Sequence, residues 1–275
     1  MGKNSKIEWT HHTFNPWWGC TRVSPACKNC YAEAWSKRVG KKIWGPKAPR
    51  RFFGEAHWNG PRKWNEEAKF SGERSRVFCA SMADVFEARK DLDEPRRKLW
   101  GLIEETPHLD WLLLTKRPER VLESVPWSDR WPNNIWVGTT VEDQESAIER
   151  LPHLGRIPAA VRFISAEPLL SELNISRWLG SSIDWVITGG ESGPRARPSS
   201  PSWFRSLLIQ CMQSNVAFHF KQWGDWAPGQ GINLAQRRAS LEAQDGTLML
   251  RVGKKVAGRV LDGETWDGLP KRRAA

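Results

Sequence analysis

Three cysteines lie within eleven residues near the start of the chain, at Cys20, Cys27 and Cys30. Six residues separate the first two and two residues separate the last two, so three thiolates can converge on one point while no fourth cysteine is near. A structural zinc site normally has four protein ligands, whereas a 4Fe-4S cluster held by three cysteines keeps one iron free for a small molecule. The missing fourth ligand therefore indicates a metal centre with an open position.

A cluster with a free iron could bind the amino and carboxylate groups of S-adenosyl-L-methionine. One-electron reduction would then cleave the sulfonium bond and give a 5′-deoxyadenosyl radical, which removes a hydrogen atom from a substrate. Zinc is the alternative, because His11, His12 or His57 could supply a fourth ligand. We expect a 4Fe-4S cluster and S-adenosyl-L-methionine as cofactors. The competing interpretation is a zinc site that only stabilises the cysteine loop, residues 20–30.

The composition favours a polyanionic partner. The chain has 42 Lys and Arg against 31 Asp and Glu, a formal net charge of +11. It also has 18 Trp and a single Tyr, and indoles can stack on bases while cations hold phosphates. The alternative for any one tryptophan is ordinary packing. We expect DNA or RNA as the partner, and a partner protein that presents the substrate is a second option.

The compartment is predicted from what the chain lacks. No stretch is long and apolar enough to span a membrane, and the N-terminal residues lack the apolar region of a signal peptide. Five cysteines, three of them clustered, favour metal binding over a disulfide framework. We expect a cytoplasmic protein with no membrane association.

Short apolar runs alternate with helical patterns along the chain. The predicted strands cover residues 7–10, 76–80, 111–114, 135–137, 161–164, 185–187 and 216–220. Helical patterns between them occupy residues 94–105, 142–151 and 202–213. This alternation is typical of βαβ units and a parallel sheet. We expect an α/β fold, a full or partial (β/α) barrel of the TIM type, with a doubly wound open sheet as the alternative.

Two segments fall outside the alternation. Residues 40–72 form a basic insertion rich in Trp, Gly and Pro, longer than a usual connection, which could be a functional loop. Residues 228–275 form a polar extension that could make a hairpin over the barrel mouth. We expect one barrel domain over residues 1–227, which includes the insertion, and a C-terminal extension over residues 228–275.

Charged residues directly follow several predicted strands, where barrel folds place their chemistry. Glu167 ends an apolar strand and could be an acid, a base or a cofactor ligand. Lys221 and Trp223 follow the last strand, so a cation and an indole could hold a base there. We take Glu167 and Lys221 as catalytic candidates and Trp223 as a substrate-binding candidate. The alternatives are a salt bridge and ordinary loop polarity.

Two more groups of residues are candidates for binding. Gly189, Gly190 and Glu191 could approach a nucleotide, because glycine allows close backbone contact and a carboxylate can accept from a ribose or an amine. A tight turn with a capping acid explains the same residues. The cations that could bind substrate phosphates are Lys116, Arg117, Arg195 and Arg197, each of which could also be a solvated surface charge.

The cysteine loop followed by Tyr31-Ala32-Glu33 resembles that of radical S-adenosylmethionine enzymes, and the whole chain resembles a phage-associated three-cysteine-motif family of unknown function. The shared features span nearly the entire chain: Trp9-Thr10, Asn15-Pro16, Gly19-Cys20, Cys27 to Glu33, Ser81-Met82-Ala83-Asp84, Leu114-Thr115-Lys116-Arg117, Glu167-Pro168-Leu169, Gly189-Gly190-Glu191-Ser192 and Phe220-Lys221-Gln222-Trp223-Gly224. The resemblance implies a cluster on the three cysteines and a cofactor site that includes Tyr31.

The chain departs from the usual radical enzyme pattern in two places. The usual spacing is C-x3-C-x2-C with an aromatic residue before the third cysteine, whereas here the first gap is six residues and Asn29 takes that place. The Gly-Gly-Glu sequence comes late, and Asp84 stands where the methionine amino group would bind. The function we expect is a radical S-adenosylmethionine-like enzyme that modifies or repairs a nucleic acid or nucleotide. The alternative is a zinc- or cluster-stapled nucleic-acid-binding protein.

Overall fold

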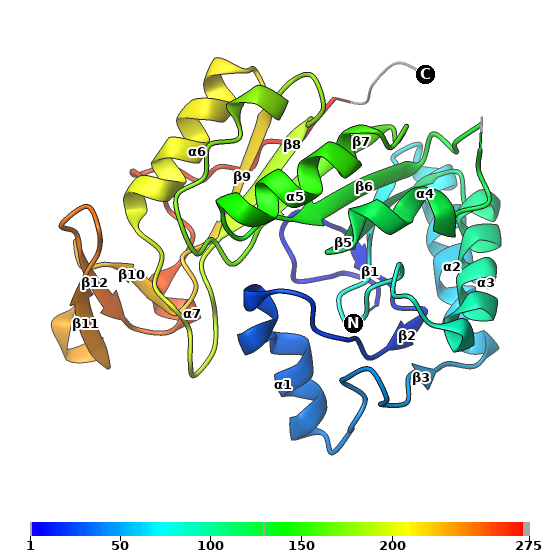
Figure 1. The fold of residues 1–275 in the computed structure, drawn as a ribbon, viewed down its shortest axis with the longest axis horizontal. Coiled ribbons are helices and arrows are strands. Elements are labelled where there is room, and N and C mark those ends of the chain that lie inside the picture. Colours follow the sequence, from blue (N-terminus) through cyan, green and yellow to red (C-terminus); the bar gives the residue numbers. More distant parts are fainter. Residues whose placement is uncertain (1, 129, 272–275) are drawn as a thin grey trace.

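A seven-stranded parallel sheet forms the body of the computed structural model, which describes residues 2–128 and 130–271 (Figure 1). Its strands, in spatial order, are β1 His12–Thr13, β4 Ser75–Cys79, β5 Leu109–Thr115, β6 Ile135–Thr140, β7 Val161–Ala166, β8 Trp185–Gly189 and β9 Ala217–Gln222. Every neighbouring pair is parallel, as the alternation of strands and helices predicts.

The strand order decides between the two α/β architectures. A doubly wound sheet changes direction part-way, so its strands do not lie in chain order. Here each strand lies beside the next one along the chain, as in a (β/α) barrel. Within the described residues β1 and β9 do not pair with each other, so the barrel is open. The predicted partial (β/α) barrel is confirmed, and the doubly wound alternative is wrong.

The helices have these bounds: α1 Tyr31–Arg38, α2 Glu55–Ser71, α3 Asp93–Glu105, α4 Val121–Ser124, α5 Gln144–Gly155, α6 Pro201–Gln213 and α7 Lys254–Ala257. Short 3-10 turns lie at Pro25–Asn29, Lys90–Leu92, Pro118–Arg120, Ser176–Trp178 and Leu234–Gln236. The start of α5 illustrates the local signals, because the Asp143 side chain accepts from the backbone of Ser146 and the Ser146 hydroxyl accepts from Asp143.

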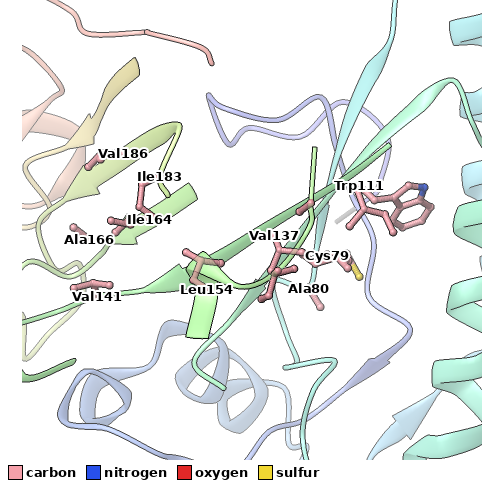
Figure 2. Close-up of a cluster of buried hydrophobic side chains, with 14 of the residues drawn as sticks. Cys79, Ala80, Trp111, Val137, Val141, Leu154, Ile164, Ala166, Ile183 and Val186 are labelled. Carbon is pink, nitrogen blue, oxygen red and sulfur yellow. The ribbon is translucent and has the colours of Figure 1, made fainter. Parts of the chain in front are cut away.

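Alternate strand residues belong to two apolar clusters, one on each face of the sheet. On β5, Trp111 and Leu113 pack in the cluster on the helix side, whereas Leu112 belongs to the cluster inside the barrel. Figure 2 shows part of the helix-side cluster, including Val137 of β6 and Leu154 of α5. Each fully buried aliphatic side chain of this kind contributes about 1.5–3 kcal/mol. This packing holds the strand ends, and therefore the site, in fixed positions.

Aromatic rings fill the inside of the barrel. Trp9 lies with its ring centroid 6.4 Å from that of Phe163 and 6.2 Å from that of Trp185. Phe78 packs closer, with its centroid 4.6 Å from Trp9. Residues 7–10 were expected to be the first strand, but they form a turn closed by Thr10 N donating to Ile7 O, and β1 follows it. Trp9 is buried inside the barrel from this turn, where the strand residues Phe78, Phe163 and Trp185 surround it.

The insertion over residues 40–72 also differs from the expected loop. It contains the short strand β3 Arg51–Phe52, which pairs with β2 Trp17–Trp18, and the helix α2. Trp58 and Trp64 of that helix are buried in the core. The segment is therefore mostly the crossover from β1 to β4, and two of its tryptophans, Trp58 and Trp64, pack in the core, whereas Trp44 is only half-buried.

The C-terminal extension forms a small antiparallel sheet with the order β10 Trp226–Pro228, β12 Leu248–Arg251 and β11 Ala239–Glu242. After α7 the chain returns to the barrel edge, where Phe220 N donates to Trp266 O and Gly268 N donates to Phe218 O. The division of the chain at residue 227 stays a prediction, and residues 272–275 lie outside the described residues. None of the helices described is both long and apolar enough to cross a membrane.

Candidate functional site

A cavity of about 480 Å³ lies at the carboxyl ends of the barrel strands. Trp9 and Phe78, which fill the barrel below, contribute to its lining. The predicted site residues that line it are Cys20, Cys27, Cys30, Tyr31, Asp84, Lys116, Arg117, Glu167, Gly190, Glu191 and Lys221. These residues come from the cysteine loop and from the ends of β4, β5, β7, β8 and β9, and the volume is within the usual range for a small-molecule site.

Cys30 immediately precedes helix α1 and occupies its N-cap position. Burial raises the pKa of the Cys30 thiol, and backbone amides of Glu33 and Ala32 and the charge of Lys116 act in the opposite direction. Amides at a helix N-terminus favour negative charge. The first turn of α1 therefore offsets part of the cost that burial places on a thiolate at Cys30, or on a sulfur-rich anionic cluster bound to it.

The other two cysteines have different surroundings. Burial, with Asp84 adding to it, raises the pKa of Cys20 to about 12, and the nearby Arg117 partly offsets this effect. Cys27 lies with its Sγ 3.9 Å from Ser24 Oγ. All three thiols are free and half-buried, which suits side chains that bind a metal. In residues 2–128 and 130–271, no three His, Cys, Asp or Glu side chains are close enough to hold a metal ion as they stand.

The histidines proposed as a fourth zinc ligand do not line this cavity. His12 stacks on Trp64 with ring centroids 4.5 Å apart, and burial lowers its pKa to about 4. His57 lies against Asn15 O at 2.8 Å, and His11 accepts from Arg76 N. Their positions give the zinc alternative no fourth ligand beside the cysteines within the part of the chain that is described.

Asp84 and Arg117 form a buried ion pair at the ends of β4 and β5, with Oδ2 to Nη1 at 2.7 Å. The Asp84 carboxylate also accepts from the Thr115 hydroxyl and from the backbone amides of Phe86 and Lys116. Arg117 in turn donates to Thr21 O, one residue after Cys20. Asp84 was predicted to bind an amino group of the cofactor. Its four hydrogen bonds make it an anchor that joins β4, β5 and the cysteine loop, and its role as a cofactor ligand stays a prediction.

Glu191 ties the other end of the cysteine loop to the end of β8. It accepts from Asn29 Nδ2 at 3.0 Å and from Arg197 Nη2 at 2.6 Å. Arg197 also donates to Pro25 O, and Asn29 donates to Arg195 O at 2.8 Å. Burial works against ionisation of Glu191, but the hydrogen bonds from Arg197 and Asn29 prevail and lower its pKa. The loop is therefore held at Thr21 and again at Asn29.

Glu167 and Lys221 form a second ion pair in the cavity, with Oε1 to Nζ at 3.0 Å. Glu167 accepts one further hydrogen bond, from Ser165 Oγ at 3.3 Å. Lys116 donates to Thr140 Oγ1 at 3.2 Å, and no carboxylate among the described residues pairs with it. These groups leave lone pairs and an ammonium charge available to a ligand.

Two buried side-chain oxygens in the lining have no hydrogen-bond donor among the described residues, namely Asn29 Oδ1 and Gln222 Oε1. A buried acceptor without a donor is costly, so a bound group that donates would lower the free energy of both. Tyr31 presents an open ring to the cavity, with 60% of the residue exposed, and its hydroxyl donates to Ser81 O. Trp44 lies in the same lining. The cavity thus combines acceptors, cations and aromatic rings.

Four predicted site residues do not line the cavity. Trp223 is buried against Phe204 and Phe220, and its Nε1 donates to Val260 O, so it belongs to the core. The others are Gly189, Arg195 and Arg197, of which Arg195 is exposed and Arg197 is held by Glu191. Gly190 lines the cavity, but a Cβ there would lie 2.0 Å from Trp223 O. A glycine is therefore needed at this position for close backbone packing, whether or not a ligand binds.

Sequence reasoning missed several polar residues of the lining, including Gln222, Thr140 and Ser165. Each of them lies at or near the end of a predicted strand, which is the signal that could have indicated them, but an uncharged side chain there is less distinctive than a charged one. Asn29 was noticed only as a departure from a pattern, and its hydrogen bonds give it a positive role in holding the loop.

The fold and the site define a partial (β/α) barrel with a cysteine-lined cavity at the carboxyl ends of its strands. The chain belongs to the family described as protein of unknown function (DUF5131), which matches residues 4–270. No curated protein matches the chain.

Solved structures of spore photoproduct lyase are similar to it in fold. A variant with bound AdoMet and dinucleoside spore photoproduct gives a TM-score of 0.48 at 12% identity, and a tyrosine-to-phenylalanine variant gives 0.49 at 11%. Both similarities cover 92% of this chain and 71% of the other.

Proposed function

We propose that the protein is a radical S-adenosylmethionine-like enzyme that modifies or repairs a nucleic acid or nucleotide, with a 4Fe-4S cluster on Cys20, Cys27 and Cys30. The observation that carries the proposal is the placement of three free thiols on one cavity at the carboxyl ends of the barrel strands. Three soft thiolate ligands suit an iron–sulfur cluster and leave one iron for a small ligand.

The cysteine loop has the support that such a cluster needs. The α1 amides next to Cys30 and the cation of Lys116 offset negative charge at the Cys30 sulfur, and Arg117 does so at Cys20. Arg117 and Asn29 fix the loop at its two ends through Thr21 and Glu191. Cys20, Cys27 and Cys30 would hold the cluster, which with S-adenosylmethionine and one electron from an external reductant would supply radical chemistry, with methionine and 5′-deoxyadenosine as its products and the hydrogen atom taken from the substrate.

The rest of the lining suits the ligands of that reaction. Asn29 Oδ1 and Gln222 Oε1 can accept from the cofactor's ammonium group or from an exocyclic amine of a base. Tyr31 and Trp44 offer faces on which adenine or a substrate base can stack. Glu167 and Lys221 can hold or move a proton at the Glu167 carboxylate, because both are partly open to the cavity.

Anaerobic reconstitution with iron and sulfide tests the proposal. We expect about four irons per chain, a broad visible absorption and, with a strong reductant and S-adenosylmethionine, release of 5′-deoxyadenosine. The variant Cys27→Ala should lose the iron and the product. The control is Cys211→Ala, which changes a buried cysteine of α6 remote from the cavity lining and should keep the iron content.

The zinc-binding alternative would replace the proposal if three results were found together: one tightly bound zinc per chain, no chromophore after reconstitution, and no 5′-deoxyadenosine under reductant. A reconstituted cluster that yields no 5′-deoxyadenosine would retain the metal site and remove the radical chemistry.

A further inference from the structure

We infer that a basic rim beside the cavity, made of Lys28, Arg195, Arg238, Lys254 and Lys255, binds the phosphodiester backbone of a single-stranded nucleic acid and leads one of its bases into the cavity. The inference rests on the proposed function and deepens it, because it assigns a substrate class and a role for the C-terminal sheet. In Figure 1 this sheet, with α7, projects on the side of the barrel away from α2 and α3.

Contacts join the rim into one surface. Asn29, the neighbour of Lys28, donates to Arg195 O at 2.8 Å. Arg251 of β12 donates to the carbonyls of Gly193 and Pro194, the residues before Arg195. The rim therefore runs without a break from the cysteine loop through the segment after β8 to the C-terminal sheet.

The same surface continues to the mouth of the cavity. Arg238 N donates to Arg251 O, and a Cβ at Gly253 would lie 3.8 Å from Arg238 Nη2. Lys254 is the next residue after Gly253 and itself lines the cavity. The rim ends at Lys254, which lines the cavity, and starts at Lys28, whose neighbours Cys27 and Asn29 line it as well.

The charge of the rim is not neutralised by the protein. All five side chains are exposed, and among the described residues none of them forms an ion pair or a side-chain hydrogen bond. By contrast, the cations deeper in the site are largely paired, Arg117 with Asp84, Lys221 with Glu167 and Arg197 with Glu191. Unpaired cations in a row are what a polyphosphate strand contacts, and each contact releases counterions.

The cavity favours a single strand over a duplex. Tyr31 and Trp44 line the recess, and a base can stack on them only if it leaves its own stack. A base within a duplex would first have to be unpaired and flipped, at a cost of a few kcal/mol. A single strand on the rim can place a base in the recess without that cost.

The test is fluorescence anisotropy with a short labelled oligothymidylate, its RNA counterpart and the DNA duplex. The full chain is measured without reductant or S-adenosylmethionine. The rim variant combines Arg195→Gln, Arg238→Gln, Lys254→Gln and Lys255→Gln. The control removes the same charge from exposed, unpaired cations of the α2 and α3 side: Lys63→Gln, Lys69→Gln, Lys90→Gln and Arg97→Gln. Thermal melting checks that both variants are folded.

We expect the rim variant to bind the single strand about 100-fold more weakly at about 0.1 M salt, with a salt slope smaller by about 3, since each lost phosphate contact removes about 0.7. The control should change little. Equal losses in the two variants, or tighter binding of the duplex than of the single strand, would overturn the inference. The RNA arm identifies which sugar the rim prefers.

The design separates this inference from the proposed function. Rim-dependent binding by a protein that forms no 5′-deoxyadenosine would retain the rim and remove the radical enzyme. A protein that releases 5′-deoxyadenosine but whose rim variant binds the strand normally would retain the enzyme and remove the rim.

Discussion

Two ion pairs line the same cavity and differ in how completely their hydrogen bonds are used. The side chains of Asp84 and Arg117 are 8% and 9% exposed, and the carboxylate accepts four hydrogen bonds. Those of Glu167 and Lys221 are 13% and 20% exposed, and Glu167 accepts only from Lys221 and Ser165. All four lone pairs of the Asp84 carboxylate are occupied, whereas Glu167 keeps lone pairs free for a ligand.

The difference separates positioning from chemistry. A saturated buried pair is rigid, and removing one partner leaves an uncompensated buried charge. Arg117 also fixes the position of the cysteine loop, because it donates a hydrogen bond to Thr21 O. A partly open pair can exchange a partner for a substrate group, and water can reach the partner that remains, so losing one partner costs less than in the saturated pair. Asp84, which the sequence suggested as a cofactor ligand, also has a structural role in the saturated pair.

The largest effect should come from Asp84→Ala. It leaves Arg117 buried without its carboxylate, so we expect the free energy of unfolding to fall by about 3–5 kcal/mol. Urea denaturation measures the loss. The matched change Glu167→Ala should cost clearly less, because Lys221 is 20% exposed and water can solvate its ammonium group when the carboxylate is removed. Equal losses at the two sites would contradict the distinction between the pairs.

Gly190→Ala tests whether the backbone near the Glu167–Lys221 pair is as rigid as the Asp84–Arg117 pair. The added Cβ would lie 2.0 Å from Trp223 O, a backbone atom that cannot move freely, so we expect a loss of about 1–3 kcal/mol. Gly101→Ala in α3 is the control, because nothing lies within 4 Å of its Cβ and alanine favours a helix by about 1 kcal/mol. If thermal melting gave the same melting temperature for both variants, the backbone at the end of β8 would be able to shift and accommodate the added Cβ.

Asn29→Ala sharpens the comparison at the other end of the cysteine loop. It removes the hydrogen bonds to Glu191 and to Arg195 O, while Arg197 still pairs with Glu191. We expect a loss of stability of about 1 kcal/mol and weaker retention of iron during dialysis. If stability falls but iron retention equals that of the unchanged protein, Asn29 supports the fold and not the metal loop.

Glu167→Gln should have the smallest effect on folding. The amide keeps the shape and can still accept from Lys221, so the free energy of unfolding should change by less than about 1 kcal/mol. Conversion of an added oligonucleotide should nevertheless fall, because an amide cannot take up a proton. Unchanged turnover would remove Glu167 from the chemistry and leave the open pair as a structural contact.

Most of the barrel could be predicted from local pattern. The six apolar runs from residue 76 onward all became strands of the sheet, and the helices at residues 94–105, 142–151 and 202–213 match α3, α5 and α6 to within four residues at each end. Residues 7–10 failed, because Trp9 makes a β-like pattern locally but is buried inside the barrel by contacts with Phe163 and Trp185. No local signal could reveal those distant partners.

The sequence by itself determined the kind of chemistry available: three clustered thiols, a strongly basic chain and polar residues after apolar strands. These are properties of residue type and spacing, which do not depend on the fold. Only the tertiary structure decided which polar groups are occupied. Asp84 meets Arg117 across two strands, and Glu191 meets Asn29 across 162 positions of sequence, so their hydrogen bonds depend on how the barrel strands and the cysteine loop pack together. Among the described residues, the same packing left Lys116 and the basic rim without a carboxylate partner, and it left Gln222 Oε1 without a hydrogen-bond donor.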